Sequence, residues 1–515
     1  MNIFKFIEIK GARDRSYLCE VNSYFLILYF DTILQSNHPK LINLKNQKKL
    51  KELIENQFEL KLKTSNHESS KANKDHLKIF SNSKYTAFSL KNNVFNNYDI
   101  ALVVEKFPNL KILDFQNTKI LNFQSNKEIS NLPFTESQLK LPILDEIQLK
   151  VLSLSNINLN ELPELIPLKK LTQLYLQMCT NLDNTFLLKE FSQLKKLHIS
   201  EVNFLENFSF SGMSQLETLI IYNNNLKNII SFENLKKLKY LMFNNCQNFN
   251  PNFSLQAMPQ LKSFIFYDSD PLPSLFSFAD NNQLEELEIS SYKRNPFPNL
   301  NSLKNLKKLE LKECLSLIHF QYFTSMSQLK ILVIDRTPFP SEPNFIGSLV
   351  HLENLQILGI NVRKIPFLYS LINLKYLSVI DCKELIDFSF LSSAPYIESL
   401  AIEVFYPDQI LHLTELRNLK NLEITDEYSS ISNLSILEKE NFKKLEKFRI
   451  TGSSLESFDF LKKLKEMKIL YFSLCKNLKN LSFLNDLEKI QEITLNYCFN
   501  ADLATTNKIS IIRIH

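Results

Sequence analysis

The chain has few of the residues on which many catalytic sites depend. Its 515 residues contain five glycines and no tryptophan. The glycines stand at positions 11, 212, 347, 359 and 452, too far apart for a phosphate-binding loop or a dinucleotide fingerprint. The sequence holds neither Cys-x-x-Cys nor His-Glu-x-x-His, so the common zinc patterns are missing. We therefore expect a protein that is not an enzyme and that carries no cofactor and no metal.

Long hydrophobic runs are also lacking. The longest run, residues 24–30, is far shorter than the roughly 20 apolar residues that a membrane-spanning helix needs. The first ten residues are charged throughout and lack a small-residue cleavage site, so they do not match an export signal. These features predict a cytoplasmic protein without a membrane span, in which the cysteines stay reduced.

A strong charge of one sign is absent too, because the net charge is only +5. Lysine pairs such as Lys195-Lys196 and Lys307-Lys308 recur along the chain, but Glu217 and Glu285 occupy the same recurring position. A nucleic-acid-binding stripe would keep one sign of charge. We interpret these lysines as a solvated flank and expect no nucleic-acid partner.

Six of the seven cysteines follow one regular pattern. Each ends the nine-residue phrase apolar-x-x-apolar-x-apolar-x-x-Cys, as in Leu171-x-x-Leu174-x-Leu176-x-x-Cys179. The six are Cys179, Cys246, Cys314, Cys382, Cys475 and Cys498. Catalytic or metal-binding cysteines have no reason to keep a register of 22–23 residues, whereas cysteines packed inside a repeat array do. We predict that all six are buried and structural.

The same phrase recurs without cysteine and divides most of the chain into repeats. It begins at residues 85, 110, 149, 171, 194, 216, 238, 261, 284, 306, 329, 355, 374, 397, 419, 445, 467 and 490, and a partial copy begins at Ile509. Most of these starts are 22 or 23 residues apart. After each phrase comes a second apolar stripe at spacing three, as in Leu478, Leu481, Leu484 and Leu487, which favours a 3₁₀ or helical return segment. Many of the 41 phenylalanines lie in these segments and are expected to form a buried spine.

This pattern resembles the leucine-rich repeat family, whose units have 20–29 residues. The resemblance implies an α/β solenoid in the shape of a horseshoe, with parallel β-strands on the concave face and 3₁₀, irregular or short helical segments on the convex face. The repeats with cysteine resemble those of plant intracellular immune receptors. The 22-residue repeats resemble bacterial internalins and a phosphatase-regulatory subunit.

The expected domain organisation is an N-terminal capping region, residues 1–80, followed by a repeat array of about 18 units, residues 81–515. The step from the phrase at 110 to the phrase at 149 is longer than the others, which predicts an insertion near residues 119–148. Insertions in repeat proteins form loops and often belong to a binding face, although a decayed repeat would leave the same pattern.

Strand geometry predicts which side chains face a partner. Positions 1, 4, 6 and 9 of the phrase should point to the core, and positions 3, 5, 7 and 8 should point to the concave face or its edge. In neighbouring repeats those outward positions are aromatic or apolar, which marks an interaction site. The predicted partner-binding residues are Tyr175, His198, Ile220, Tyr222, Tyr240, Met242, Ile265 and Tyr267. Folding of the N-terminal region or the insertion over this face is the alternative.

Farther along the array the same positions become charged. We expect a secondary charged patch, either a polar rim or a contact that orients a partner, at Glu288, Glu310, Lys312, Asp335 and Arg336. A merely solvated surface is an equally open interpretation.

Two functions are consistent with these features. The first is a non-catalytic interaction module that binds a protein or peptide partner on its concave face. The second is a substrate adaptor or regulatory subunit of an enzyme complex, such as an F-box-like ubiquitin ligase adaptor or a phosphatase regulator. The usual Leu-Pro opening and later tryptophan of an F-box are missing from the N-terminal region.

Overall fold

The structure is a computed structural model of the chain. It describes residues 150–514, except 157–169, 183–192, 203, 205–207, 211–212, 228, 234, 271, 274–275, 280, 293–295, 427–430 and 432, and four earlier segments, 87–91, 94–96, 112–116 and 119–121. The chain divides into two compact units, Met1–Lys237 and Leu238–His515. Each unit is described by itself.

The unit Met1–Lys237 is built on a parallel sheet. Its strands pair side by side in the order β1, β3, β5, β6, β7 and β9. Two further parallel pairs, β2 with β4 and β8 with β10, lie outside this sheet. The bounds are β1 Ala87–Lys91, β2 Val94–Asn96, β3 Ile112–Gln116, β4 Lys119–Leu121, β5 Val151–Ser155, β6 Gln173–Gln177, β7 Lys196–Ser200, β8 Phe208–Ser209, β9 Thr218–Tyr222 and β10 Ile229–Ser231.

The unit Leu238–His515 continues the same strand pattern. Each described strand from β11 to β22 pairs in parallel with the next one along the chain. The bounds are β11 Tyr240–Asn244, β12 Ser263–Tyr267, β13 Glu286–Ser290, β14 Lys308–Lys312, β15 Ile331–Asp335, β16 Asn354–Leu358, β17 Tyr376–Ile380, β18 Ser399–Glu403, β19 Asn421–Thr425, β20 Lys447–Thr451, β21 Ile469–Ser473, β22 Glu492–Asn496 and β23 Ile512–Ile514.

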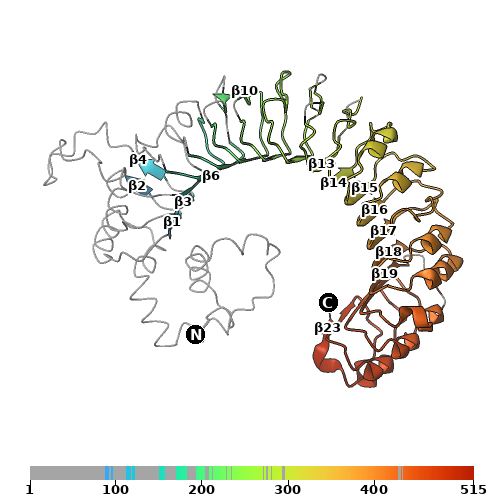
Figure 1. The fold of residues 1–515 in the computed structure, drawn as a ribbon. Coiled ribbons are helices and arrows are strands. Elements are labelled where there is room, and N and C mark those ends of the chain that lie inside the picture. The colour runs from blue at the N-terminus through green and yellow to red at the C-terminus, as the bar shows by residue number, and fades with distance from the viewer. Residues whose placement is uncertain are drawn as a thin grey trace, which may run out of the picture. The chain divides into compact units, whose positions relative to one another are not determined.

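Short 3₁₀ helices carry the chain back between strands in this second unit. Within it the strands lie along the inner side of a curve and the helices along the outer side (Figure 1). The predicted 3₁₀ return segments are thus confirmed here. The described 3₁₀ helices are Phe320–Ser325, Asn344–Ser348, Ser389–Ser393, Pro407–Glu415, Ser435–Glu438, Glu440–Phe442, Asp459–Lys463, Ser482–Asp486, Leu503–Thr505 and Ile509–Ile511.

The core follows from the alternation within each phrase. Positions 4 and 6 are buried from repeat to repeat, as Leu174 and Leu176 show, because alternate residues of a strand share one face. All six patterned cysteines are buried with free thiols, which confirms that they pack the core. Aromatic rings join successive return segments, and the Phe458 ring lies 4.7 Å from that of Phe472 and 6.3 Å from that of Phe483.

The strand register agrees with the sequence at all but one repeat. Apart from the short strands β2, β4, β8 and β10, each strand occupies positions 3–7 of its expected phrase, and β23 lies inside the partial copy. The exception is the phrase expected to begin at Leu355, because β16 places the first position at Leu352. Leu349, Leu352 and Leu355 are spaced by three, so the return stripe runs into the strand and obscures where the phrase begins. With the start at 352, the repeat lengths here return to 23 and 22 residues.

The predicted domain boundaries fall mostly on residues outside the described part of the chain. Residues 1–80 lie there, and so does most of the expected 119–148 insertion. Strands β3 and β5 on either side of it pair directly, beginning with Ile112 opposite Val151. The capping region and the role of the insertion stay predictions. Within the described ranges, every helix is too short or too polar to span a bilayer.

Candidate functional site

The solvent side of the sheet, called the strand face here, is shaped by the turn that ends each strand. The residue at position 8 adopts a positive φ in most described repeats, whatever its side chain, as in Met178, Glu313 and Leu474. Its backbone N–H donates to the position-7 carbonyl of the following repeat, for example from Met178 to Ser200 at 2.8 Å. The turn therefore fixes where positions 3, 5 and 7 point.

Position 9 completes the turn through a side chain of the following repeat. The Val202 N–H donates to Asn224 Oδ1 at 2.8 Å, and the Cys314 N–H donates to the Thr337 hydroxyl at 3.1 Å. Where position 9 is cysteine, the thiol donates backward, as from Cys314 to the Ile289 carbonyl at 3.4 Å. A thiol is a weak donor, yet it satisfies the buried carbonyl that faces it.

In the first unit, three rings on successive strands form a chain of contacts. His198 on β7 lies between Tyr175 on β6 and Tyr222 on β9, with ring centroids 5.9 Å and 5.3 Å away. The rings and Ile220 beside them are each half-buried. We call Tyr175, His198, Ile220 and Tyr222 the aromatic cluster. The structure brings together these four predicted residues on one face.

A cation borders the aromatic cluster. The Lys196 Nζ lies 5.6 Å from the centre of the Tyr175 ring, within the range of a cation–π interaction. Burial and the Lys196 charge lower the pKa of His198 to about 4. The imidazole is therefore neutral at neutral pH and packs as an aromatic ring.

In the second unit, the other four predicted residues differ in exposure. Met242 and Ile265 are only 8% and 7% exposed, although they stand at outward positions of their strands. The Tyr240 hydroxyl lies 3.6 Å from Met242 Sδ and covers part of that side chain. Tyr240 and Tyr267 are half-buried and remain on the surface. Strands β11 and β12 hold these four residues, Tyr240, Met242, Ile265 and Tyr267, in register, and we call them the second cluster.

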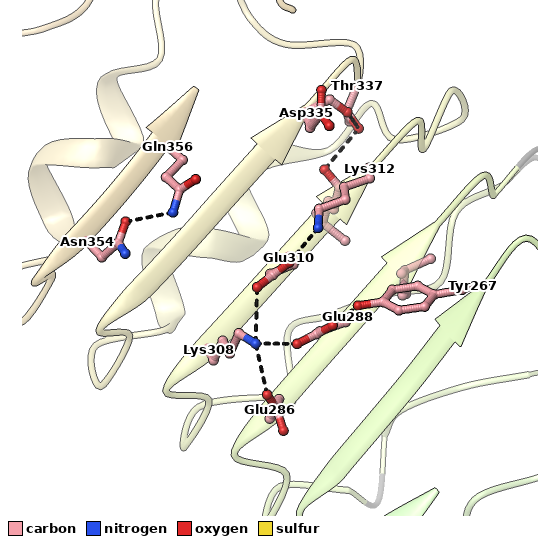
Figure 2. A network of polar contacts seen from close by, with 12 residues as sticks. Tyr267, Glu286, Glu288, Lys308, Glu310, Lys312, Asp335, Thr337, Asn354 and Gln356 are labelled. Atoms are coloured by element: carbon pink, nitrogen blue, oxygen red, sulfur yellow. Dashed lines mark hydrogen bonds and ion pairs between the residues drawn. The ribbon is translucent and has the colours of Figure 1, made fainter. Parts of the chain in front are cut away.

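The charged patch is a network that satisfies its own charges. Figure 2 shows Lys308 between Glu286, Glu288 and Glu310. Glu288 is only 6% exposed and accepts hydrogen bonds from Lys308 and from the Tyr267 hydroxyl. Hydrogen bonds to these carboxylates raise the pKa of Lys308, although burial opposes the shift. The ion pairs hold the side chains in place without any partner.

The far edge of the charged patch is more exposed. Lys312 bonds Glu310 at 2.8 Å, and Arg336 bonds Asp335 at 3.1 Å and approaches Glu313 at 3.7 Å. Exposed pairs of this kind contribute little to stability and are easily rearranged. The predicted charged patch is therefore brought together on adjacent strands, with its buried end fixed and its outer end open to solvent.

A phrase of 22 or 23 residues, a parallel strand at its positions 3–7, and a core of positions 4, 6 and 9 recur through the described array. This is the leucine-rich repeat fold. No family model matches the sequence, and no curated protein matches it either.

Comparison with solved structures finds several chains that match much of this one. A Leptospira interrogans LRR protein is 18% identical, with 69% of this chain and 92% of that chain covered and a TM-score of 0.43. The TLR13 chain of a complex with ssRNA13 is 19% identical, covering 85% and 62%, with a TM-score of 0.45. The functional domain of InlJ from Listeria monocytogenes, which includes a cysteine ladder, is 15% identical, covering 76% and 70%, with a TM-score of 0.35.

Sequence reasoning missed one apolar pair on the strand face. Leu358 and Ile380 are half-buried at position 7 of β16 and β17 and pair opposite each other. The misplaced phrase at Leu355 assigned Leu358 to the core and so hid this pair. A strict 23-residue step from the phrase at 329 would have revealed it.

The strand face offers apolar contacts beside paired charges. Among the described residues, no group of three or more His, Cys, Asp or Glu side chains could hold a metal ion. The expectation that nucleic acid is not a partner stays a prediction.

Proposed function

We propose that the chain is a non-catalytic interaction module that binds a protein partner on its strand face, with the aromatic cluster as the energetic centre in the first unit. The observation that carries this proposal is the row of half-buried rings on β6, β7 and β9. Rings held by their neighbours lose little entropy on binding and supply large contact areas. Tyrosine is also enriched at the centres of protein interfaces.

The second unit supports a further contact. The Tyr240 hydroxyl contacts the sulfur of the buried Met242, and the Tyr267 hydroxyl bonds the buried Glu288, so both rings are held by neighbouring side chains. The charged patch next to them carries fixed charges of both signs, which favours one orientation of a partner over another. We propose that the second cluster binds the partner and that the charged patch sets the orientation of the bound partner.

A cytoplasmic location belongs to the same proposal. The six patterned cysteines are free thiols in the core of the array, and such cysteines persist in reducing compartments. The adaptor or regulatory alternative depends on residues 1–80, which lie outside the described residues.

An affinity pull-down from the native organism identifies the partner, and titration of variants then tests the site. Tyr222→Ala should weaken binding by about 2 kcal/mol or more, close to thirtyfold, because it removes a ring from the centre of the cluster. Lys236→Ala is the matched control, since Lys236 is exposed in the segment before the next phrase and should leave affinity unchanged. The thermal midpoint of each variant checks folding. Equal affinities for the wild type and Tyr222→Ala would contradict the proposed centre.

The second cluster needs a gentler substitution. Tyr267→Phe keeps the ring and removes the hydroxyl that bonds Glu288, whereas Tyr267→Ala also uncovers that buried carboxylate. If the ring is what binds, Tyr267→Phe should keep nearly full affinity and Tyr267→Ala should lose it. An equal loss in both would show that the Glu288 network, rather than the ring, governs binding.

A further inference from the structure

Two of the patterned cysteines stand next to each other. Cys475 and Cys498 both occupy position 9, in consecutive repeats whose strands β21 and β22 pair in register from Ile469 opposite Glu492 to Ser473 opposite Asn496. Neighbouring parallel strands are about 4.8 Å apart. Disulfide-bonded cysteines have Cα atoms roughly 4.4–6.8 Å apart. The ladder thus holds the two residues at a spacing that a disulfide bond can span.

The pairing of the two repeats continues beyond the strands to the residue before Cys475, because the Leu474 N–H donates to the Asn496 carbonyl at 2.9 Å. The two thiols also make matching bonds within their own repeats, from Cys475 to the Ser473 carbonyl at 3.4 Å and from Cys498 to the Asn496 carbonyl at 3.5 Å. The two side chains are therefore equivalent neighbours in one column of the core. At the corresponding place Cys314 faces the Thr337 hydroxyl instead of a second thiol.

The surroundings make the two thiols chemically unequal. The neighbouring Cys475 lowers the pKa of Cys498 to about 7, although burial opposes the shift. The neighbouring Cys498, together with burial, raises the pKa of Cys475. Burial also raises the pKa of Cys314 to about 12. Cys498 is 9% exposed while Cys475 and Cys314 are fully buried. Cys498 therefore combines the two features of a reactive cysteine, a stabilised thiolate and some contact with solvent.

We propose that Cys498 and Cys475 form a redox-responsive modification site, in which hydrogen peroxide converts the two thiols into a disulfide that links the repeats of β21 and β22. The Cys498 thiolate attacks one peroxide oxygen, so an S–O bond forms and the O–O bond breaks, leaving a sulfenic acid and hydroxide. The Cys475 sulfur then attacks the Cys498 sulfur, an S–S bond forms, the S–O bond breaks, and the Cys475 proton leaves in water. In sum, two thiols and one hydrogen peroxide give one disulfide and two waters, and a thiol reductant reverses the change.

The test treats the native full-length chain with hydrogen peroxide, blocks the remaining thiols with an alkylating reagent, and digests the product with trypsin without reduction. The two cysteines fall on separate tryptic peptides, residues 469–476 and 490–508. We expect mass spectrometry to find these peptides joined, with the loss of two hydrogens, and to find them separate after reduction. In untreated protein, Cys498 should alkylate at least about tenfold faster than Cys314.

Variants separate this chemistry from nonspecific oxidation. Cys475→Ser should leave Cys498 as a sulfenic acid that a 1,3-dione probe captures, and Cys498→Ser should abolish both the probe signal and the cross-link. Cys314→Ser should leave the cross-link unchanged. Serine already occupies position 9 at Ser269, where it accepts the Cys246 N–H at 2.9 Å, so these variants keep the turn. Absence of the joined peptides in the folded wild type, or equal alkylation of Cys498 and Cys314, would overturn the proposal.

Discussion

At the scale of single residues, the turn overrides side-chain preference. Position 8 takes a positive φ not only at Gly359 and Gly452 but also at Met178, Leu474 and Tyr497. A left-handed conformation costs a residue with a side chain roughly 1–2 kcal/mol. The array tolerates this strain because two neighbouring repeats hold the turn through backbone hydrogen bonds. A substitution that relieves this strain at an exposed position 8 should therefore stabilise the protein without disturbing the core.

Leu474→Gly should stabilise the protein by about 0.5–1 kcal/mol, because glycine relieves the left-handed strain while costing some entropy in the unfolded chain. Gly359→Ala should destabilise it by about 1–2 kcal/mol. A Cβ at Gly359 would lie 2.5 Å from the Arg336 Cγ, but that side chain is exposed, so the backbone at φ +61° carries most of the cost. Chemical denaturation of both variants measures the difference. A destabilised Leu474→Gly would show that the exposed leucine packs after all.

His198 predicts a dependence of stability on pH. Its pKa is about 4 in the folded protein and about 6.5 when unfolded. As pH falls from 6.5 towards 4, the unfolded chain binds a proton that the folded His198 does not, so stability declines across this window. His198→Gln should reduce the decline in thermal midpoint between pH 7 and pH 4.5. An identical decline in both proteins would mean that the imidazole is exposed or paired with an acid.

At the scale of elements, neighbouring repeats supply the hydrogen-bond acceptors for one another's turns. Where the usual backbone acceptor is not used, a side chain of the next repeat takes its place. The Asp381 N–H, at position 8, donates to the buried Glu403 carboxylate at 2.6 Å instead of to a backbone carbonyl. A carboxylate on the strand face thus has a structural role. The same reasoning explains why the turn hydroxyls at position 9 should be costly to remove.

Thr337→Val should destabilise the protein by about 1–2 kcal/mol, because the buried Cys314 N–H loses its acceptor while the volume of the side chain is kept. The control is Thr324→Val, whose hydroxyl bonds the Gln321 carbonyl on the exposed side of a 3₁₀ helix. Hydrogen exchange at the Cys314 amide, together with the thermal midpoint, measures the effect. Similar changes in both variants would assign the cost to loss of a hydroxyl in general.

The strands could be predicted where the repeat of 22 or 23 residues is the dominant pattern in the sequence. The burial and the contacts of the site residues were harder to predict. The strands of the array follow from the phrase, and the single error arose at Leu355, where the three-residue spacing of the return stripe matches the start of a strand. Which way a side chain points also follows from alternation. How deeply it is buried does not, because Met242 is covered by neighbours from the same face. Pairing between the charges of different strands, such as Lys308 with Glu288, likewise depends on the register of the whole sheet.

At the scale of the whole molecule, the side chains at position 2 of successive phrases form rows of oppositely charged pairs. Each row runs along the N-terminal ends of the strands in its sheet. In the second unit Glu285 lies between Lys262 and Lys307 at 2.7 Å from each. The Glu398–Lys420 pair, at 2.6 Å, repeats the arrangement farther along. This edge explains the recurrent lysine pairs as a solvated flank whose charges are matched by glutamates.

These rows of charged pairs predict a modest dependence of stability on salt and acid. Hydrogen bonds from lysines lower the pKa of Glu285, Glu353, Glu398 and Glu446 below their usual value near 4.5. Their contribution is therefore present above that value and is lost as pH falls through the lower folded values. Because the pairs are exposed, raising the salt from about 0.01 M to about 1 M at pH 7 should lower the thermal midpoint by only a few degrees. A midpoint that rises with salt would show that repulsion among the lysines outweighs these pairs.

The hydrogen bond at position 9 runs one way along the chain, from the amide of one repeat to a side chain of the next. A ribosome delivers the amide first and its acceptor some twenty residues later. The position-9 amide of each newly made repeat therefore stays bonded to water until the next repeat emerges. The last repeat of the growing chain is thus always the one that lacks this bond. Because each of these bonds needs only the next repeat along the chain, we expect the array to fold repeat by repeat in the order in which it is synthesised.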